Sequence, residues 1–176
     1  MHGGGRARVA KAPVFRVIIP ARMRSTRLPG KMLADIAGRP MVARVAERAA
    51  RSGAAEVIIA TDHARIARAA QALGWRVCVT SPAHATGTDR LAEAVAQLGL
   101  GDREIVVNVQ GDEPLIDPGL VGQVASELAR RPKASIATAA HAITSARAFF
   151  DPNVVKVVCD EEGYAALSEM GQRAKA

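Results

Sequence analysis

The chain has 176 residues, 49% of them apolar and only 3% aromatic, which suits one domain of helices packed on an aliphatic sheet. Its net charge of +7 arises at the start, because residues 1–31 hold eight of the 24 cations and no acid, leaving 16 cations against 17 acids (16 − 17 = −1). A duplex-binding protein usually carries cations across a whole face, so a basic nucleic-acid-binding protein is only a minor alternative.

The first regular element is a buried strand at 14–19, a mostly β-branched run that Pro20 ends. Residues 36–38 form a turn, and Pro40 then starts a helix that stops at Gly53. This helix has one apolar face, made of Met41, Val42, Val45, Ala46 and Ala49.

Strands and helices alternate through the rest of the chain. Further strands are expected at 57–60, 76–80, 105–110, 134–140 and 154–159. Helices are expected at 63–73, from the 84–90 loop through Leu98, and at 118–131, and a hairpin turn at 160–163. This alternation predicts an α/β fold with a mostly parallel sheet covered by helices on both faces.

Ligands of such sheets bind beyond the carboxyl ends of the strands. Four segments fall there: the 20–31 loop, Thr61-Asp62, the 84–90 loop and Asp112. The candidate site residues are therefore expected at this edge.

The 20–31 loop is strongly basic, with Arg22, Arg24, Arg27 and Lys31 in ten positions and no carboxylate. A nucleoside triphosphate, with roughly four negative charges, would satisfy these side chains through charge-assisted hydrogen bonds. On composition alone, a solvated surface or a nucleic-acid patch is an equal alternative. Neither G-x-x-x-x-G-K-[ST] nor G-x-G-x-x-G occurs in the chain.

The twelve positions Pro20-Ala21-Arg22-x-x-Ser25-Thr26-Arg27-Leu28-Pro29-Gly30-Lys31 resemble the signature loop of 3-deoxy-manno-octulosonate (Kdo) cytidylyltransferases. Sialic acid cytidylyltransferases have a different loop, with Ser-Lys-Gly-Ile-Pro. The resemblance implies a Rossmann-like three-layer nucleotide-diphospho-sugar transferase fold. It also implies a cytoplasmic, homodimeric enzyme that joins CTP and Kdo into CMP-Kdo and pyrophosphate for lipopolysaccharide biosynthesis, with Mg²⁺ as cofactor.

Asp112 follows a predicted strand in Asn108-Val109-Gln110-Gly111-Asp112-Glu113-Pro114, a second stretch that resembles the family. A lone Gly-Asp is more often a capping or loop carboxylate. The resemblance instead implies that Asp112 binds Mg²⁺, which favours one or two carboxylates together with phosphate oxygens and water.

The resemblance further implies that Arg22 and Lys31 hold the triphosphate and that Lys31 stabilises the departing pyrophosphate. Arg27 would contact the substrate or brace the loop, and Ala21 would lie against the substrate. Gln110 would contact the sugar acid or merely cap its strand.

The segment His84-Ala85-Thr86-Gly87-Thr88-Asp89-Arg90 is a third similar stretch, and the resemblance implies that it closes around the cytosine, with His84 and Thr86 in contact. An ordinary Asp89–Arg90 ion pair at a helix start is nearly as good an interpretation. Asp62 would orient the nucleotide or the loop. A fourth stretch, 151–158, is interpreted as structural.

The resemblance runs from about Phe15 to Tyr164. Family members continue through sugar-acid-binding residues, the main dimer contacts and a second Mg²⁺-binding aspartate. The expected organisation is therefore a disordered leader at 1–12, a CTP-binding nucleotidyltransferase domain at 13–164 that is incomplete at its C-terminus, and a tail at 165–176 unlike the family, as a truncation would leave. An inactive CTP-binding remnant of the enzyme is the alternative function.

Cys78 and Cys159 are far apart and each lies among valines, which predicts two buried thiols in a reducing cytosol and neither a disulfide nor a metal pair. No apolar run approaches the ~18 residues of a membrane span, so no membrane partner is expected.

Overall fold

The computed structural model describes residues 12–23 and 28–165, in two units divided between Pro132 and Lys133. Residues 1–11 of the leader predicted at 1–12, Arg27, and residues 166–176 of the tail predicted at 165–176 lie outside the described residues. The sequence did not predict the boundary at 132.

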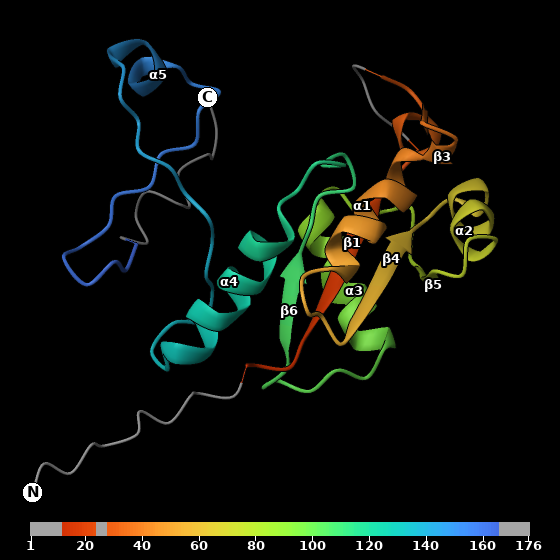
Figure 1. Ribbon diagram of the computed structural model, residues 1–176, viewed down its shortest axis with the longest axis horizontal. Helices are drawn as coiled ribbons and strands as arrows, with labels where there is room; N and C mark the ends of the chain where they lie inside the picture. The colour runs from red at the N-terminus through yellow and green to blue at the C-terminus, as the bar shows by residue number, and fades with distance from the viewer. Residues whose placement is uncertain (1–11, 24–27, 166–176) are drawn as a thin grey trace, which may run out of the picture. The chain divides into compact units, whose positions relative to one another are not determined.

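The first unit is built on a parallel sheet of four strands in the order β5-β4-β1-β6 (Figure 1). The strands are β1 (Phe15–Ala21), β4 (Glu56–Thr61), β5 (Arg76–Val79) and β6 (Ile105–Asn108). All three pairings are parallel, and Ile18 of β1 lies in register with Ile58 and with Asn108. Four of the predicted strands are confirmed, with two differences at their ends. β1 continues through Pro20 to Ala21, in register with β4, so the prediction that Pro20 ends this strand was wrong. β6 ends at Asn108, two residues earlier than expected, although the Val109 N–H still donates to the Ile18 carbonyl at 3.3 Å.

Helices cover both faces of this sheet, because alternate residues of β1 point to opposite sides. Val17 and Ile19 pack with buried residues of α1 (Met41–Ala50), α2 (Ala64–Gln71) and α4 (Pro118–Arg130). Ile18 packs instead with Ala94 of α3 (Gly87–Gln97). The three-layer α/β architecture expected from the alternating pattern is confirmed.

The chain between β1 and α1 forms three short elements. They are the 3₁₀ turn η1 (Lys31–Leu33) and the antiparallel pair β2 (Asp35–Ile36) and β3 (Arg39–Pro40). Gly38 adopts a positive φ of 81° between the two strands, and its N–H donates to the Asp35 carboxylate at 3.0 Å. The predicted turn at 36–38 is therefore present.

The strands predicted at 134–140 and 154–159 were wrong. The described part of the second unit, 133–165, contains α5 (Ala146–Phe150) and an isolated antiparallel bridge between Cys159 and Ala165. The first run is mostly alanine, which is depleted in strands, and only the second is rich in valine. A valine-rich run still needs a neighbouring strand to complete its hydrogen bonds, and Ile136 and Val155 are exposed.

The hairpin turn at 160–163 is present, since Gly163 N–H donates to the Asp160 carbonyl at 3.0 Å. Cys159 is exposed, which corrects the prediction of a second buried thiol, whereas Cys78 is buried as expected.

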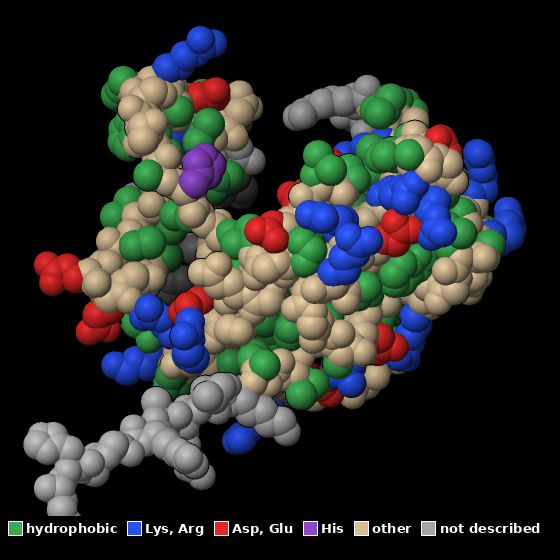
Figure 2. Space-filling model, viewed as in Figure 1, with side chains coloured by type: hydrophobic (Ala, Val, Ile, Leu, Met, Phe, Trp, Pro, Cys, Tyr) green, Lys and Arg blue, Asp and Glu red, His purple; other side chains and the backbone are tan. Residues whose placement is uncertain are grey.

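Charges of both signs are interspersed over the face of the first unit shown in Figure 2, with no continuous basic stripe among its described residues. Several cations of this unit lie in ion pairs: Arg76 with Glu56 at 2.5 Å, and Arg44 with Glu47 at 3.1 Å. In the described part of the chain, no helix is both long enough and apolar enough to cross a membrane.

Candidate active site

The carboxyl ends of the four parallel strands bring the predicted site residues to one edge of the sheet. Arg22 follows β1, Asp62 follows β4, and Asp112 lies four residues beyond the end of β6. The 80–86 segment follows β5 at the same edge. The sequence expectation about this edge therefore agrees with the topology.

Lys31 and Asp112 form an ion pair at this edge, in which the Lys31 ammonium donates to an Asp112 carboxylate oxygen. Their side chains are 28% and 42% exposed, so both remain accessible to a ligand. The structure thus brings together a proposed phosphate-binding cation and the proposed metal-binding carboxylate.

Gly30 sets the position of Lys31 at the start of η1. It adopts a positive φ of 72°, which a glycine tolerates without a steric penalty. Its N–H donates to the Met23 carbonyl at 3.2 Å, and the Lys31 N–H donates to the Leu28 carbonyl at 3.3 Å. The first bond joins the two described sides of the basic loop, and the second closes a local turn over 28–31.

Gly111 sets the position of Asp112. A Cβ atom at this residue would lie 2.9 Å from the Met32 sulfur and 2.9 Å from the Pro20 carbonyl oxygen. Only a residue without a side chain lets the segment after β6 pass so close to the end of β1. This role of Gly111 could not be read from the sequence, because Met32 and Pro20 lie far from it along the chain.

The donor set at this edge fits a hard divalent cation that takes part of its coordination from the oxygens of a phosphate. Asp112 offers one accessible carboxylate, and Mg²⁺ is commonly held by one or two carboxylates, substrate phosphates and water. No cluster of three or more His, Cys, Asp or Glu among the described residues could form an all-protein metal site. Substrate oxygens would therefore have to supply much of the coordination.

The other residues predicted near the triphosphate differ in accessibility. Arg22 is exposed and makes no ion pair or hydrogen bond to another described residue. The Gln110 side chain is exposed and donates to Asn108 Oδ1 at 3.4 Å. The side chain of Ala21 is buried in β1, in register with Thr61, which leaves its main chain as the only route to a ligand.

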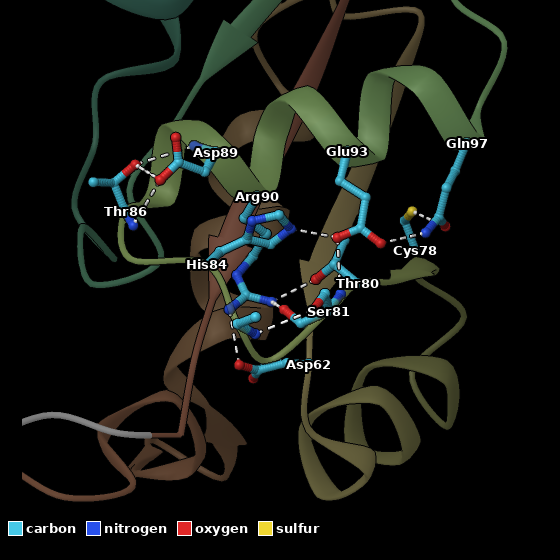
Figure 3. Close-up of polar contacts among 11 residues, drawn as sticks. Asp62, Cys78, Thr80, Ser81, His84, Thr86, Asp89, Arg90, Glu93 and Gln97 are labelled. Atoms are coloured by element: carbon cyan, nitrogen blue, oxygen red, sulfur yellow. Dashed lines mark hydrogen bonds and ion pairs between the residues drawn. The ribbon is translucent and has the colours of Figure 1, made fainter.

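A second polar cluster joins α3 to the ends of β4 and β5 (Figure 3). Arg90 is 3% exposed, and its guanidinium donates to Asp62 Oδ2 at 2.8 Å, to the Thr80 hydroxyl, and to the Ser81 carbonyl at 3.4 Å. The alternative of an ordinary Asp89–Arg90 ion pair is thereby corrected, because Arg90 pairs with Asp62. A charge this deeply buried needs such a partner.

Thr86 and Asp89 form a capping box at the start of α3. Asp89 N–H donates to Thr86 Oγ1 at 3.1 Å, and Thr86 N–H donates to the Asp89 carboxylate at 3.1 Å. The Thr86 hydroxyl and N–H both stabilise the Asp89 carboxylate and lower its pKa. Residues 87–90, expected in the loop, are therefore the first turn of a helix.

His84 contacts Glu93 of α3 through its Nε2 atom. The same carboxylate accepts from the Ser81 N–H at 2.8 Å and from Gln97 at 2.8 Å. The hydrogen bond from His84, followed by that from Ser81, lowers the pKa of Glu93 and keeps it charged. Glu93 was not predicted as a site residue, because it lies in α3 and belongs to no sequence motif.

Comparison with known proteins gives consistent matches. The model of the family described as cytidylyltransferase matches residues 16–173. The 3-deoxy-manno-octulosonate cytidylyltransferase of Vibrio vulnificus (strain YJ016) is 59% identical over 151 residues, which cover 86% of this chain and 60% of that protein. The protein of the same name from Acidovorax sp. (strain JS42) is 58% identical over 157 residues, covering 89% of this chain and 60% of that protein.

A solved structure of a CMP:2-keto-3-deoxy-manno-octonic acid synthetase complexed with CTP has the same fold. It superposes with a TM-score of 0.80 at 42% identity, covering 87% of this chain and 62% of that one. The chain spans about 60% of the length of the curated relatives it matches.

Proposed function

The chain belongs to the cytidylyltransferase family, and from this premise we propose that it binds CTP and transfers the cytidylyl group to Kdo, releasing pyrophosphate. The observation that carries the proposal is the meeting of Lys31 and Asp112 at the carboxyl edge of the sheet. The proposal includes Mg²⁺ as the metal, a role in lipopolysaccharide biosynthesis, and a homodimer in the cytoplasm.

In this mechanism, Lys31 and Arg22 bind the triphosphate oxygens by charge-assisted hydrogen bonds. Lys31 offsets the charge that develops on the departing pyrophosphate. Asp112 would hold Mg²⁺, which when bound neutralises charge on the phosphate oxygens. Gln110, an exposed residue two positions before Asp112, contacts the sugar acid.

The Lys31–Asp112 ion pair has to open when the nucleotide binds. A partly exposed pair is worth only about 0–1 kcal/mol, so opening it costs little. When metal and triphosphate bind together, the triphosphate replaces Asp112 as the partner of Lys31, and the metal replaces Lys31 as the partner of Asp112. Either ligand alone would leave one side chain without its counter-charge.

Equilibrium binding of Mg²⁺–CTP and Mg²⁺–ATP to the 176-residue chain tests the proposal. We expect CTP to bind more tightly, and Lys31→Ala to weaken its binding by roughly tenfold or more, the effect of one charge-assisted contact. Lys133→Ala, which removes an exposed lysine of the second unit, is the matched control. Equal binding of the two nucleotides, or equal losses in the two variants, would contradict the proposal.

A coupled pyrophosphate assay with Mg²⁺, CTP and Kdo tests the transfer step separately. Pyrophosphate release that depends on Kdo would support transfer by this chain. Tight CTP binding without release would instead favour the alternative of a CTP-binding protein without turnover.

A further inference from the structure

The segment that follows β5, Thr80–Thr86, is held by two side chains of α3 that are one turn apart. Glu93 accepts the Ser81 N–H at 2.8 Å, and Arg90 donates to the Ser81 carbonyl at 3.4 Å. The main chain of Ser81 is thus bound on both sides. Glu93 also contacts His84, and Arg90 also donates to the Thr80 hydroxyl, so these two side chains bind residues over the range 80–84 (Figure 3).

Arg90 links this segment to the neighbouring strand end. Its guanidinium is almost completely buried and pairs with Asp62, directly after β4. One planar group therefore fixes the ends of β4 and β5 relative to α3, a geometry that the fork of donors on an arginine can satisfy.

The segment Thr80–Thr86 runs along the edge of the sheet toward the proposed triphosphate site. It leaves β5, and at Gly87 it reaches the end of β1, where a Cβ atom would lie 3.5 Å from the Pro20 ring. In the strand order β5-β4-β1, the first and last strands are about 10 Å apart, at about 4.8 Å per strand. A triphosphate bound beside β1 would leave its base near this segment.

The segment also presents main chain that a ligand can reach. Ala85 is exposed, and its N–H and C=O groups form no hydrogen bond with another residue in the described part of the chain. Its methyl side chain is too small to shield them. A base could therefore be recognised here by the backbone, whose position depends on what holds it.

We propose that Arg90 and Glu93 are positioning residues that set the base selectivity of the nucleotide site, by fixing the main chain of Thr80–Thr86 where it meets the base. This proposal rests on the proposed function.

A base-selectivity role differs measurably from general support of the fold. Loss of selectivity would lower the affinity for CTP relative to UTP, a nucleotide of the same size, and would spare inorganic tripolyphosphate, which has no base. General damage to the fold would instead weaken all three ligands together.

The experiment compares the binding of Mg²⁺ complexes of CTP, UTP and tripolyphosphate to the full chain and its variants. Glu93→Ala removes the acceptor for Ser81 while keeping a strong helix former in α3. Arg90→Lys keeps the charge but loses the forked geometry, and Glu93→Gln restores an acceptor. Glu127→Ala removes an acid of α4 that pairs with Arg130 and serves as the matched control.

We expect Glu93→Ala and Arg90→Lys to reduce the preference for CTP over UTP by about tenfold, the effect of one charged hydrogen bond, and to leave tripolyphosphate binding unchanged. Glu93→Gln should recover part of the preference, and Glu127→Ala should match the wild type.

An unchanged preference in both variants would overturn the proposal, and so would a loss of tripolyphosphate affinity that equals the loss for CTP. A wild-type chain that binds tripolyphosphate but does not prefer CTP would overturn the proposed function itself, and the inference with it.

Discussion

Lys31 and Asp112 are 81 residues apart, yet the ammonium of one donates to the carboxylate of the other. Lys31 is the cation that would bind phosphate, and Asp112 is the anion that would bind metal. While no ligand is bound, the two side chains neutralise each other. The consequence is that nucleotide and metal should affect one another's binding.

Asp112→Asn tests this coupling at the scale of single residues. The substitution removes the charge with little change of shape, so the fold should persist and the Mg²⁺ dependence of CTP binding should disappear. In EDTA, metal-free CTP should bind more tightly to the variant than to the wild type, because Lys31 is released and a repelling carboxylate is gone. Titration calorimetry with and without Mg²⁺ measures both effects.

Glu113→Gln, at the neighbouring exposed acid, is the control and should leave both measurements unchanged. A large fall in the melting temperature of Asp112→Asn would show that Asp112 is a structural residue. Weaker binding of metal-free CTP would contradict the coupling.

At the scale of elements, the approach of the segment after β6 to the end of β1 depends on one glycine. Gly111→Ala would place a methyl group 2.9 Å from the Pro20 carbonyl, and the backbone there cannot move aside without disturbing β1. Overpacking of this kind costs about 1–3 kcal/mol, and it should also displace Asp112 and weaken Mg²⁺–CTP binding.

Gly101→Ala is the matched control, because a Cβ atom there would meet nothing within 4 Å. Chemical denaturation should show destabilisation in the first variant only. Equal stability of the two variants would mean that the close approach at Gly111 is not tight in solution.

The capping box of α3 predicts a pH dependence. The bonds from Thr86 lower the pKa of Asp89 below its ordinary value of 3.8, so the folded state favours the charged carboxylate. This contribution to stability is present above pH 3.8 and is lost as the pH falls through the lower, folded-state pKa. Asp89→Asn should therefore lower the melting temperature at pH 7, and its difference from the wild type should shrink in acid.

Melting curves from pH 7 down to about pH 3 check this prediction, with Asp102→Asn, at an exposed loop acid, as the control. A difference that stays constant over this range would mean that the Asp89 charge contributes nothing to the cap.

At the scale of the whole molecule, the two units differ in how much they bury. Both core clusters consist of residues of the first unit, and every described residue of 133–165 is exposed or only partly buried. The predicted edge site also lies entirely in the first unit. A chain that ends at Pro132 should therefore keep its cooperative unfolding and its binding of Mg²⁺–CTP.

Limited trypsin digestion should accordingly cut first in the second unit, where Lys133 and Arg147 are exposed, and leave a stable fragment of the first. Mass spectrometry identifies the cuts, and circular dichroism follows unfolding of the shortened chain. Loss of the folded state on removal of 133–176 would contradict this prediction.

The sequence by itself determined the layers of the first unit and the edge at which the site residues gather. Strand runs such as 57–60 and helix faces such as that of α1 are local patterns of hydrophobic periodicity, which a linear sequence displays directly. Parallel topology then sends all the strand ends to one edge. The family motifs identified Lys31 and Asp112 individually.

Only the tertiary structure decided which side chains meet. The Arg90–Asp62 pair joins residues 28 apart in the sequence, and Gly111 is constrained by Met32 and Pro20, which belong to other elements. The run at 154–159 has strand composition, whereas the run at 134–140 is mostly alanine, and neither has a strand beside it in the described residues. Periodicity reports which face of an element is apolar, whereas a salt bridge, a steric limit or a strand requires a second segment, and its position is a property of the folded chain.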